Sequence, residues 1–300
     1  MTAKKYCKKD SSIYNYQFFD NEMQLLSIKH STLESEIRKA IKNQEWQLYY
    51  QPKLDLKKNK IVGIEALIRW NHPERGILSP FEFIGFAEDR GFIIDIGDWV
   101  IEESCKQFKL WSDNGIKPCK ISINLSSVQL RQEDIVNRII TAMKNYNVPP
   151  RLFEVEITET TLTKNFDVSA RSLERLNARG VSIAIDDFGV GYSSLSYLKN
   201  FPINRLKIDR SFIKDLCYDD SDKKIVQTLI SMAHSMDVIV VAEGVETEEQ
   251  LTLLNQYKCD EIQGYFISKP VPAEKIDGMI KQLESKPIKP PKANPNLRSV

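Results

Sequence analysis

Short apolar segments alternate with longer amphipathic segments over most of the chain. Eight short segments have the length and composition of β-strands, namely Gln47–Leu56, Lys60–Arg69, Cys119–Leu125, Phe153–Thr158, Val181–Asp186, Arg205–Ile208, Val238–Ala242 and Glu261–Gln263. The amphipathic segments predict helices at Thr32–Asn43, Pro80–Asp89, Asp95–Asn114, Gln132–Tyr146, Asp167–Arg179, Ser193–Lys199, Asp222–Ser235, Glu248–Gln256 and Ala273–Leu283. Strands that alternate with helices in this way are typical of α/β proteins.

Eight strands with helices between them favour a modified, TIM-like (β/α)8 barrel. A doubly wound open sheet is the alternative that the same pattern allows. The first two strands are joined by only a few residues, 57–59. Because a parallel crossover needs a dozen or more residues, we expect the first strand to run antiparallel to the second.

The two ends of the chain differ in composition from the rest. Residues 1–29 are polar and aromatic without a clear period, and we expect them to form an N-terminal extension or linker. Residues 286–300 are rich in Pro and Lys, which predicts a disordered tail. Residues 30–285 are then the barrel domain, and 300 residues are long enough for one such barrel.

Composition excludes several classes of partner and site. The net charge of +1 gives no argument for a nucleic-acid polymer. Five scattered cysteines without a CxxC pair suggest reduced thiols in the cytoplasm, and three histidines without metal spacing argue against a zinc site. No apolar run is long enough to cross a membrane, so we expect no membrane insertion of this chain, although a longer parent protein tethered upstream is compatible with this.

Polar side chains share one face of the predicted strands. Side chains alternate along a strand, so in FEVEIT the residues Glu154 and Glu156 lie opposite Val155 and Ile157. The other strands carry polar residues on the same face or at their ends, which are Glu65, Arg69, Asn124, Asp186, Lys207, Glu243 and Gln263. Because strand ends meet at the mouth of a barrel, we expect these side chains to gather there.

Several acids at one barrel mouth repel one another unless cations hold them. Carboxylate and amide oxygens are the ligands of hard ions such as Mg²⁺ or Mn²⁺. The adjacent Asp186 and Asp187 suit two ions about 3.5–4 Å apart, as in displacement at phosphorus. Lys207 beside them is placed to orient water or stabilise developing charge. From the residues alone, phosphoester hydrolysis and enolate chemistry both stay open.

Longer motifs are more specific. The segment from Tyr49 to Pro272 contains YYQPKLDL, GIEALIRWNHPERG, SPFEFIGFAEDRG, INLSSVQL, EVEITET, DDFGVGYSSL, LKIDRSF, VAEGVET and QGYFISKPVP. In order and spacing these resemble the EAL-domain phosphodiesterases, which hydrolyse the bacterial second messenger cyclic di-GMP. The resemblance implies a modified barrel with an antiparallel first strand. It also implies metal-dependent hydrolysis of one phosphodiester bond to linear pGpG, which lowers the messenger level.

The resemblance assigns roles to matching positions. It implies that one metal ion is held by Glu65, Asn124, Glu156 and Asp186, and the second by Asp186, Asp187 and Glu243. The implied catalytic residues are Lys207, Glu243 and Glu65, with Lys207 and Glu243 on the attacking water. The implied nucleotide contacts are Gln51, Arg69 and Gln263, and the implied loop supports are Glu159 and Glu246. Two Mg²⁺ or Mn²⁺ ions would support turnover, and Ca²⁺ would inhibit it.

Some features depart from the family pattern or lie outside it. Val190 stands in the GVG loop where family members more often have a small hydroxyl residue. Residues 6–23 weakly resemble the end of a diguanylate cyclase (GGDEF) domain, but no GG[DE]EF motif occurs and we expect no cyclase activity. The resemblance also suggests a homodimer through the DDFG-loop surface. A receptor that binds cyclic di-GMP without cleaving it is the second functional hypothesis, and an enolase-like barrel is a distant third.

Overall fold

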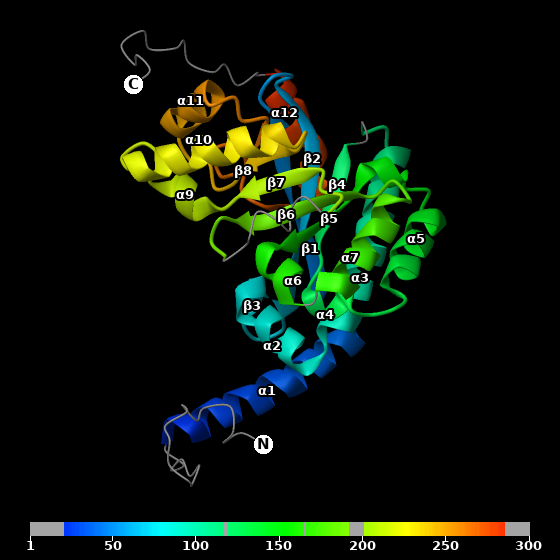
Figure 1. Ribbon diagram of the computed structural model, residues 1–300. Coiled ribbons are helices and arrows are strands. Elements are labelled where there is room, and N and C mark those ends of the chain that lie inside the picture. Colours follow the sequence, from blue (N-terminus) through cyan, green and yellow to red (C-terminus); the bar gives the residue numbers. More distant parts are fainter. Residues whose placement is uncertain (1–20, 117–118, 165, 192–200, 286–300) are drawn as a thin grey trace.

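The computed structural model describes residues 21–116, 119–164, 166–191 and 201–285 (Figure 1). Within these residues one sheet runs in the order β10-β1-β9-β8-β7-β6-β5-β4-β2-β3, and an additional β1–β2 pairing closes it. Its strands are β1 (Trp46–Asp55), β2 (Lys60–His72), β3 (Gly76–Leu78), β4 (Lys120–Asn124), β5 (Phe153–Thr158), β6 (Ser182–Phe188), β7 (Arg205–Ile208), β8 (Ile239–Ala242), β9 (Glu261–Ile262) and β10 (Val271–Pro272). The closed sheet confirms the barrel and excludes the open-sheet alternative.

Strand β1 runs against its neighbours. It pairs antiparallel with β2 and with β9, whereas β2, β4, β5, β6, β7, β8 and β9 are successively parallel. The antiparallel first strand predicted from the short 57–59 connection is therefore confirmed. The short strands β3 and β10 were not predicted; they extend the barrel edges by pairing antiparallel with β2 and β1.

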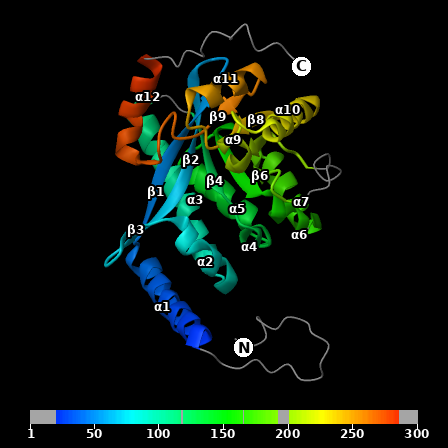
Figure 2. The same cartoon turned by 90° about the vertical axis from the view of Figure 1, so that its left-hand side faces the viewer.

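Helices surround the barrel (Figures 1 and 2). They are α1 (Asn21–Asn43), α2 (Ile84–Arg90), α3 (Ile93–Asp113), α4 (Ser127–Leu130), α5 (Ile135–Asn145), α6 (Glu159–Lys164), α7 (Phe166–Asn177), α9 (Arg210–Lys214), α10 (Asp220–Ser235), α11 (Glu248–Gln256) and α12 (Ile276–Ser285). Short 3-10 turns lie at η2 (Pro80–Glu82), η3 (Pro150–Leu152) and η4 (Ala273–Lys275). None of the helices in the described part of the chain has the length and apolar character to cross a membrane.

Several predicted boundaries were wrong. The helix expected at Pro80–Asp89 is interrupted at Phe83, and the one expected at Gln132–Tyr146 begins only at Ile135. The helix expected at Thr32–Asn43 begins already at Asn21. The division of the chain at residues 29/30 and 285/286 stays a prediction. The expected helix Ser193–Lys199, residues 1–20 and the tail 286–300 lie outside the described residues.

Helix starts follow local capping signals. Thr247 precedes α11, and its side-chain oxygen accepts a hydrogen bond from the backbone N–H of Gln250. The Gln250 side chain in turn accepts the backbone N–H of Thr247, which completes a capping box. Ser126 and Gln129 make the same arrangement at α4. These caps fix where the chain turns from a strand end into a helix, and so they fix the loops at the barrel mouth.

The apolar strand face packs outward against the helices. Ile121, Ile123, Val155 and Ile157 are almost fully buried in this layer. An aromatic group made of Trp46, Trp70 and Phe83 joins β1, β2 and the turn before α2, with ring centroids 5.3–5.6 Å apart. Trp46 and Trp70 are thus packing residues.

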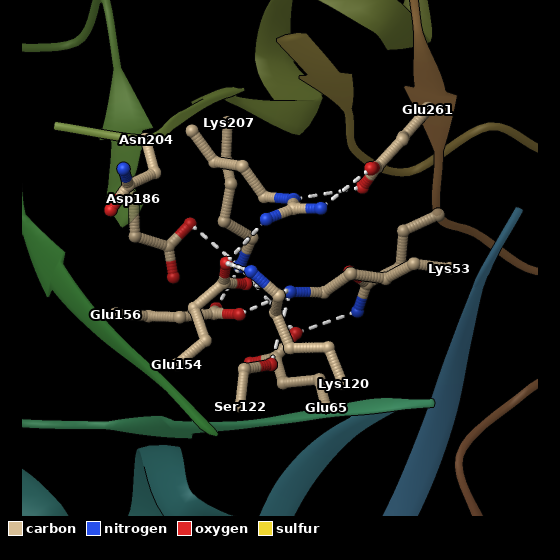
Figure 3. A network of polar contacts seen from close by, with 12 residues as sticks. Lys53, Glu65, Lys120, Ser122, Glu154, Glu156, Asp186, Asn204, Lys207 and Glu261 are labelled. Atoms are coloured by element: carbon tan, nitrogen blue, oxygen red, sulfur yellow. Dashed lines mark hydrogen bonds and ion pairs between the residues drawn. The ribbon is translucent and has the colours of Figure 1, made fainter. Parts of the chain in front are cut away.

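The opposite strand face fills the barrel with charge. Arg205 donates to both carboxylate oxygens of Glu261, at 2.8 and 3.1 Å, and to Oε2 of Glu154 at 2.9 Å. Lys53 and Lys120 also contact Glu154, at 3.2 and 3.5 Å. Many of these side chains point toward one another inside the barrel (Figure 3). Where most barrels of this kind stack branched apolar residues, this interior is an ionic network.

Helix α1 reaches the barrel beside its mouth. Because β1 is antiparallel, its first residue Trp46 pairs with Trp70 near the end of β2. The Glu36 carboxylate accepts from Arg75 at 2.9 Å, and the Arg38 guanidinium lies 4.7 Å from the centre of the Phe92 ring. Both views place α1 next to α2 and β3 (Figures 1 and 2).

The network predicts a specific stability loss. Arg205→Met leaves Glu154 and Glu261 without their shared guanidinium in a buried site, which should lower the free energy of unfolding by about 3–5 kcal/mol. The measurement is urea unfolding followed by circular dichroism. Lys281→Met is the matched control, because its pair with Asp277 is exposed and should contribute less than about 1 kcal/mol. Equal losses in both variants would contradict the interpretation.

Candidate active site

The predicted polar residues meet at the carboxyl ends of the parallel strands. Glu65 lies on β2, Asn124 on β4, Glu156 on β5, Asp186 on β6 and Lys207 on β7. Glu243 and Gln263 directly follow β8 and β9. Asn124 and Glu156 are register partners, and the Asn124 amide donates to Glu65 Oε1 at 2.7 Å. The parity argument therefore placed these residues on one face at one end.

Carboxylates at the mouth form two groups that overlap. Single oxygens of Glu65, Glu156 and Asp186 lie within 4.8 Å of one another, and so do oxygens of Asp186, Asp187 and Glu243. Asp186 belongs to both groups. With the Asn124 amide, every side chain in these groups offers an oxygen and none offers sulfur or imidazole. The donor set fits a pair of hard divalent cations that share Asp186.

Lys207 sits among these acids. Its Nζ lies 2.7 Å from Glu243 Oε1, 3.0 Å from Asp186 Oδ1 and 3.4 Å from Glu65 Oε2, and it also contacts Glu156 Oε2. The side chain is buried. Burial alone would lower the pKa of Lys207, but the surrounding carboxylates hold it well above its ordinary value. The lysine is therefore a permanent cation at the centre of the site.

One lysine does not balance all the acids. Burial, helped by Asp186, raises the pKa of Glu243 well above its ordinary value, and burial also raises the pKa of Glu65. The pKa of Asp187 rises to about 6 through burial and the neighbouring charges of Asp186 and Asp209. Burial and the neighbouring acids together disfavour negative charge on these carboxyl groups, and divalent cations would relieve this.

A backbone irregularity brings Asp187 to the site. Neighbouring residues of a regular strand point to opposite faces, which would direct Asp187 away from Asp186. Here Asp187 has a left-handed φ of 54°, and the β6–β7 register shifts between Ile185 and Phe188. Such a conformation is costly for a residue other than glycine and is typical of functional sites. It places both aspartates at the mouth.

The following loop is held by Glu159. Its Oε2 accepts the backbone N–H groups of Gly189 at 2.9 Å and Gly191 at 3.3 Å. Gly189 has a φ of 103°, and a Cβ there would lie 2.7 Å from the Phe212 ring. The Val190 side chain is 63% exposed. The backbone contacts thus need no hydroxyl at position 190, and they agree with the loop-supporting role predicted for Glu159.

A pocket of about 740 Å³ opens over the acids. One wall carries the candidate ligands together with Gln51, Glu246 and Gln263. The other wall is largely apolar and comes from β2, η2, α2 and α3, with Leu67, Ile84, Ile96 and Val100 among its residues. The pocket therefore joins a charged floor to an apolar side, which suits a ligand with both anionic and flat ring parts.

The predicted nucleotide contacts differ in their placement. Gln263 donates to Gln51 at 3.0 Å and to Glu65 Oε2 at 2.6 Å, and its own Oε1 is buried without a partner among the described residues. Arg69 is not among the residues that line the pocket; it donates to the Ile68 carbonyl, and its guanidinium lies 5.4 Å from the centre of the Tyr49 ring.

Three nearby residues were missed by the sequence reasoning. Asp209 adds negative charge beside Asp187 and caps α9. Arg210 lines the pocket, pairs with Glu246 at 3.0 Å and packs where a side chain on Gly244 would stand. Lys53 is the third, and its Nζ contacts Oε1 of Glu156. The LKIDR segment carried a signal for Asp209, which continues the polar face of Lys207, but none for Arg210.

Fold and site together define an α/β barrel protein with an oxygen-only candidate metal centre at its mouth. A family model described as EAL domain matches residues 34–270. The chain belongs to the EAL domain family.

Curated relatives are longer proteins. The bifunctional diguanylate cyclase/cyclic di-GMP phosphodiesterase MucR of Pseudomonas aeruginosa is 39% identical over 274 residues, which is 91% of this chain and 40% of that protein. The signaling protein YkoW of Bacillus subtilis is 41% identical over 275 residues, 92% of this chain and 34% of that protein. The cyclic di-GMP phosphodiesterase NbdA of Pseudomonas aeruginosa is 37% identical over 267 residues, which is 89% of this chain and 34% of that protein. The chain thus spans well under half the length of these relatives.

Solved structures share the fold. The PaMucR phosphodiesterase in its c-di-GMP complex superposes with a TM-score of 0.78 at 40% identity, covering 82% of this chain and 99% of that chain. An EAL domain protein from Listeria monocytogenes gives a TM-score of 0.72 at 33% identity, covering 82% and 96%.

The shared aspartate predicts a metal-binding defect. Asp186→Asn removes one charge from both acid groups while keeping the side-chain size. We expect Mn²⁺ to bind at least about tenfold more weakly, since changes in the outer shell alone commonly cost about 10–100-fold. The measurement is isothermal titration of Mn²⁺. Asp113→Asn, on the exposed end of α3, is the control and should bind as the wild type; unchanged affinity in Asp186→Asn would contradict the site.

Proposed function

We propose that this chain is a cyclic di-GMP phosphodiesterase. In this proposal it uses two Mg²⁺ or Mn²⁺ ions to hydrolyse one phosphodiester bond, releases linear pGpG and so lowers the second-messenger level in bacterial signalling. One observation carries the proposal: two acid groups that share Asp186 form the floor of a pocket of about 740 Å³. The names of MucR and NbdA, and the c-di-GMP bound to PaMucR, support the choice of substrate.

The candidate ligands divide between the two ions. Glu65, Asn124, Glu156 and Asp186 would hold one ion, and Asp186, Asp187 and Glu243 the other. When bound, such a pair of ions polarises the phosphoryl oxygens and lowers the pKa of a coordinated water. All donors are hard oxygens, which favours Mg²⁺ or Mn²⁺ over thiophilic metals.

The residues around the attacked phosphorus handle a proton and a charge. In hydrolysis to pGpG the water oxygen bonds to phosphorus, the bond from phosphorus to the 3′-oxygen breaks, and that oxygen gains a proton. Glu243 would accept the proton of the water, because its carboxylate lines the pocket beside Asp186 and Asp187. Lys207, 2.7 Å from Glu243, would orient the water and stabilise charge on the phosphoryl oxygens.

The remaining pocket residues hold the nucleotide. The unpartnered Gln263 Oε1 offers an acceptor to a base or ribose donor. Gln51 fixes Gln263 from the other side. The apolar wall of β2, α2 and α3 suits the flat face of a guanine base. Arg69, which lies beside Tyr49 and outside the pocket lining, would contact the nucleotide from the pocket edge, and Glu246 would support that edge through Arg210.

A receptor that binds cyclic di-GMP without cleaving it is the alternative. It would keep the pocket but would not need the full set of acids. Every predicted acid is present, and the acids meet at one mouth. This favours catalysis over binding alone, and the match to the EAL domain family argues against enolate chemistry.

Turnover gives the decisive test. Incubation of the chain with cyclic di-GMP and Mn²⁺ should yield pGpG on chromatography, Mg²⁺ should also support the reaction, and Ca²⁺ should inhibit it. Glu65→Ala and Asp186→Ala should lower turnover at least about 10³-fold, because each removes an oxygen on which charge stabilisation depends. The exposed Glu274→Ala should keep full activity. Intact cyclic di-GMP with the wild type, or full turnover in either acid variant, would refute the proposal.

Assembly can be tested separately. We propose a homodimer through the DDFG-loop surface, in which Val190, 63% exposed, would be an apolar contact. Light scattering at working concentration should give twice the chain mass, and Val190→Glu should shift it to the mass of one chain. A fully active monomer would show that dimerisation is not required. The cytoplasmic location and the relation of residues 6–23 to a GGDEF domain stay predictions.

A further inference from the structure

A second buried lysine touches the candidate metal centre. Lys53 lies on β1, and its Nζ contacts Oε1 of Glu156. Its side chain is only 2% exposed, and the chemistry outlined above makes no use of it. We propose that Lys53 is the positioning residue of the metal centre: it fixes one oxygen of Glu156 so that the other oxygen faces the cations. The inference rests on the metal-dependent function proposed above.

The place of Lys53 follows from its strand. Lys53 pairs with Gly63 on β2, and the register shifts directly after it. Gly63 has no side chain, and a Cβ at that position would lie 3.4 Å from Lys53 Cδ. The aliphatic stem of the lysine therefore lies along the space that Gly63 leaves, and its ammonium group extends into the barrel toward Glu156 (Figure 3).

The ammonium group is anchored away from the mouth. Lys53 Nζ donates to Ser122 Oγ at 3.0 Å and to Glu154 Oε1 at 3.2 Å. Glu154 is itself held by Arg205 at 2.9 Å. None of these partners is a candidate metal ligand. The position of Lys53 is thus set by Ser122 and by the ion pairs around Glu154, away from the barrel mouth.

Lys207 differs in its partners. Lys207 contacts Glu156 through Oε2, and its other acidic partners are Glu65, Asp186 and Glu243, all candidate ligands. A cation bound there competes with Lys207 for the same oxygens, whereas Lys53 keeps Ser122 and Glu154. The two lysines therefore have different roles on one carboxylate: Lys53 orients it, and Lys207 occupies the face that meets the cations.

Orientation of the Glu156 carboxylate before the metal ion binds should raise the metal affinity by a measurable factor. A carboxylate with one oxygen fixed does not have to be ordered when the ion arrives, and outer-shell partners of this kind commonly contribute about 10–100-fold to metal affinity. The interior also needs the charge of Lys53, because Glu154 and Glu156 are both buried. An experiment must therefore separate positioning from charge balance.

Mn²⁺ titration of four proteins makes this separation. Lys53→Met removes the contact with Glu156. The double variant Lys53→Met/Glu154→Gln removes the same contact but also removes one buried anion, so the interior charge stays as in the wild type. Lys120→Met is the matched control, because Lys120 contacts Glu154 but not Glu156. We expect about 10–100-fold weaker Mn²⁺ binding in both Lys53 variants and wild-type binding in Lys120→Met.

The outcomes distinguish the possible roles. Recovery of Mn²⁺ affinity in the double variant would overturn the proposal, because charge balance alone would then explain Lys53. Equal affinity of Lys53→Met and the wild type would also overturn it while leaving the phosphodiesterase proposal intact. No Mn²⁺ binding by the wild type would refute the metal centre and this inference together. If Lys53→Met does not fold, the charge-balanced double variant decides, with its circular dichroism spectrum as the check on folding.

Discussion

Pairing of buried charges inside the barrel is the constraint on which the rest of the structure depends. A carboxylate removed from water costs several kcal/mol unless a cation and hydrogen bonds compensate it. The interior meets this condition with Arg205 and Lys207, which bridge acids from different strands, and with Lys53 of β1, which pairs with both acids of β5. Strand order and charge pairing therefore support each other, because the acids meet their cations only when the sheet is closed.

The candidate site is the part of this ionic network that lies at the barrel mouth. Away from the barrel mouth, the buried acids Glu154 and Glu261 are both paired with Arg205. At the mouth the acids outnumber the lysine, and the pKa of Asp187 rises to about 6. The change from balanced to unbalanced charge within one barrel is what distinguishes a structural ion network from a place where divalent cations would bind.

Much of the fold and part of the site could be predicted from the sequence, for identifiable reasons. The short connection 57–59 determined the direction of β1, and strand parity placed Glu156, Asp186 and Lys207 on one face. Parity could not place Asp187, because its left-handed backbone breaks the alternation. It also could not show which cation meets which acid: the Lys53–Glu156 contact joins residues 103 positions apart, and side-chain pairing at that range depends on the closed barrel. The orientation of Arg69 toward Tyr49 is likewise a choice between rotamers that no sequence pattern reveals.

The reversed direction of β1 has a mechanical consequence. A regular barrel of this kind receives its chain at the face opposite the mouth, whereas here α1 arrives at the mouth and packs on α2 through the Glu34–Arg90 pair and the His30–Phe86 ring contact. Helix α2 also supplies part of the pocket wall through Ile84 and Gly85. The position of α1 and the shape of this pocket wall are therefore coupled through α2. The antiparallel β1 thus makes the first helix of the described chain a packing partner of the pocket wall, not of the opposite end of the barrel.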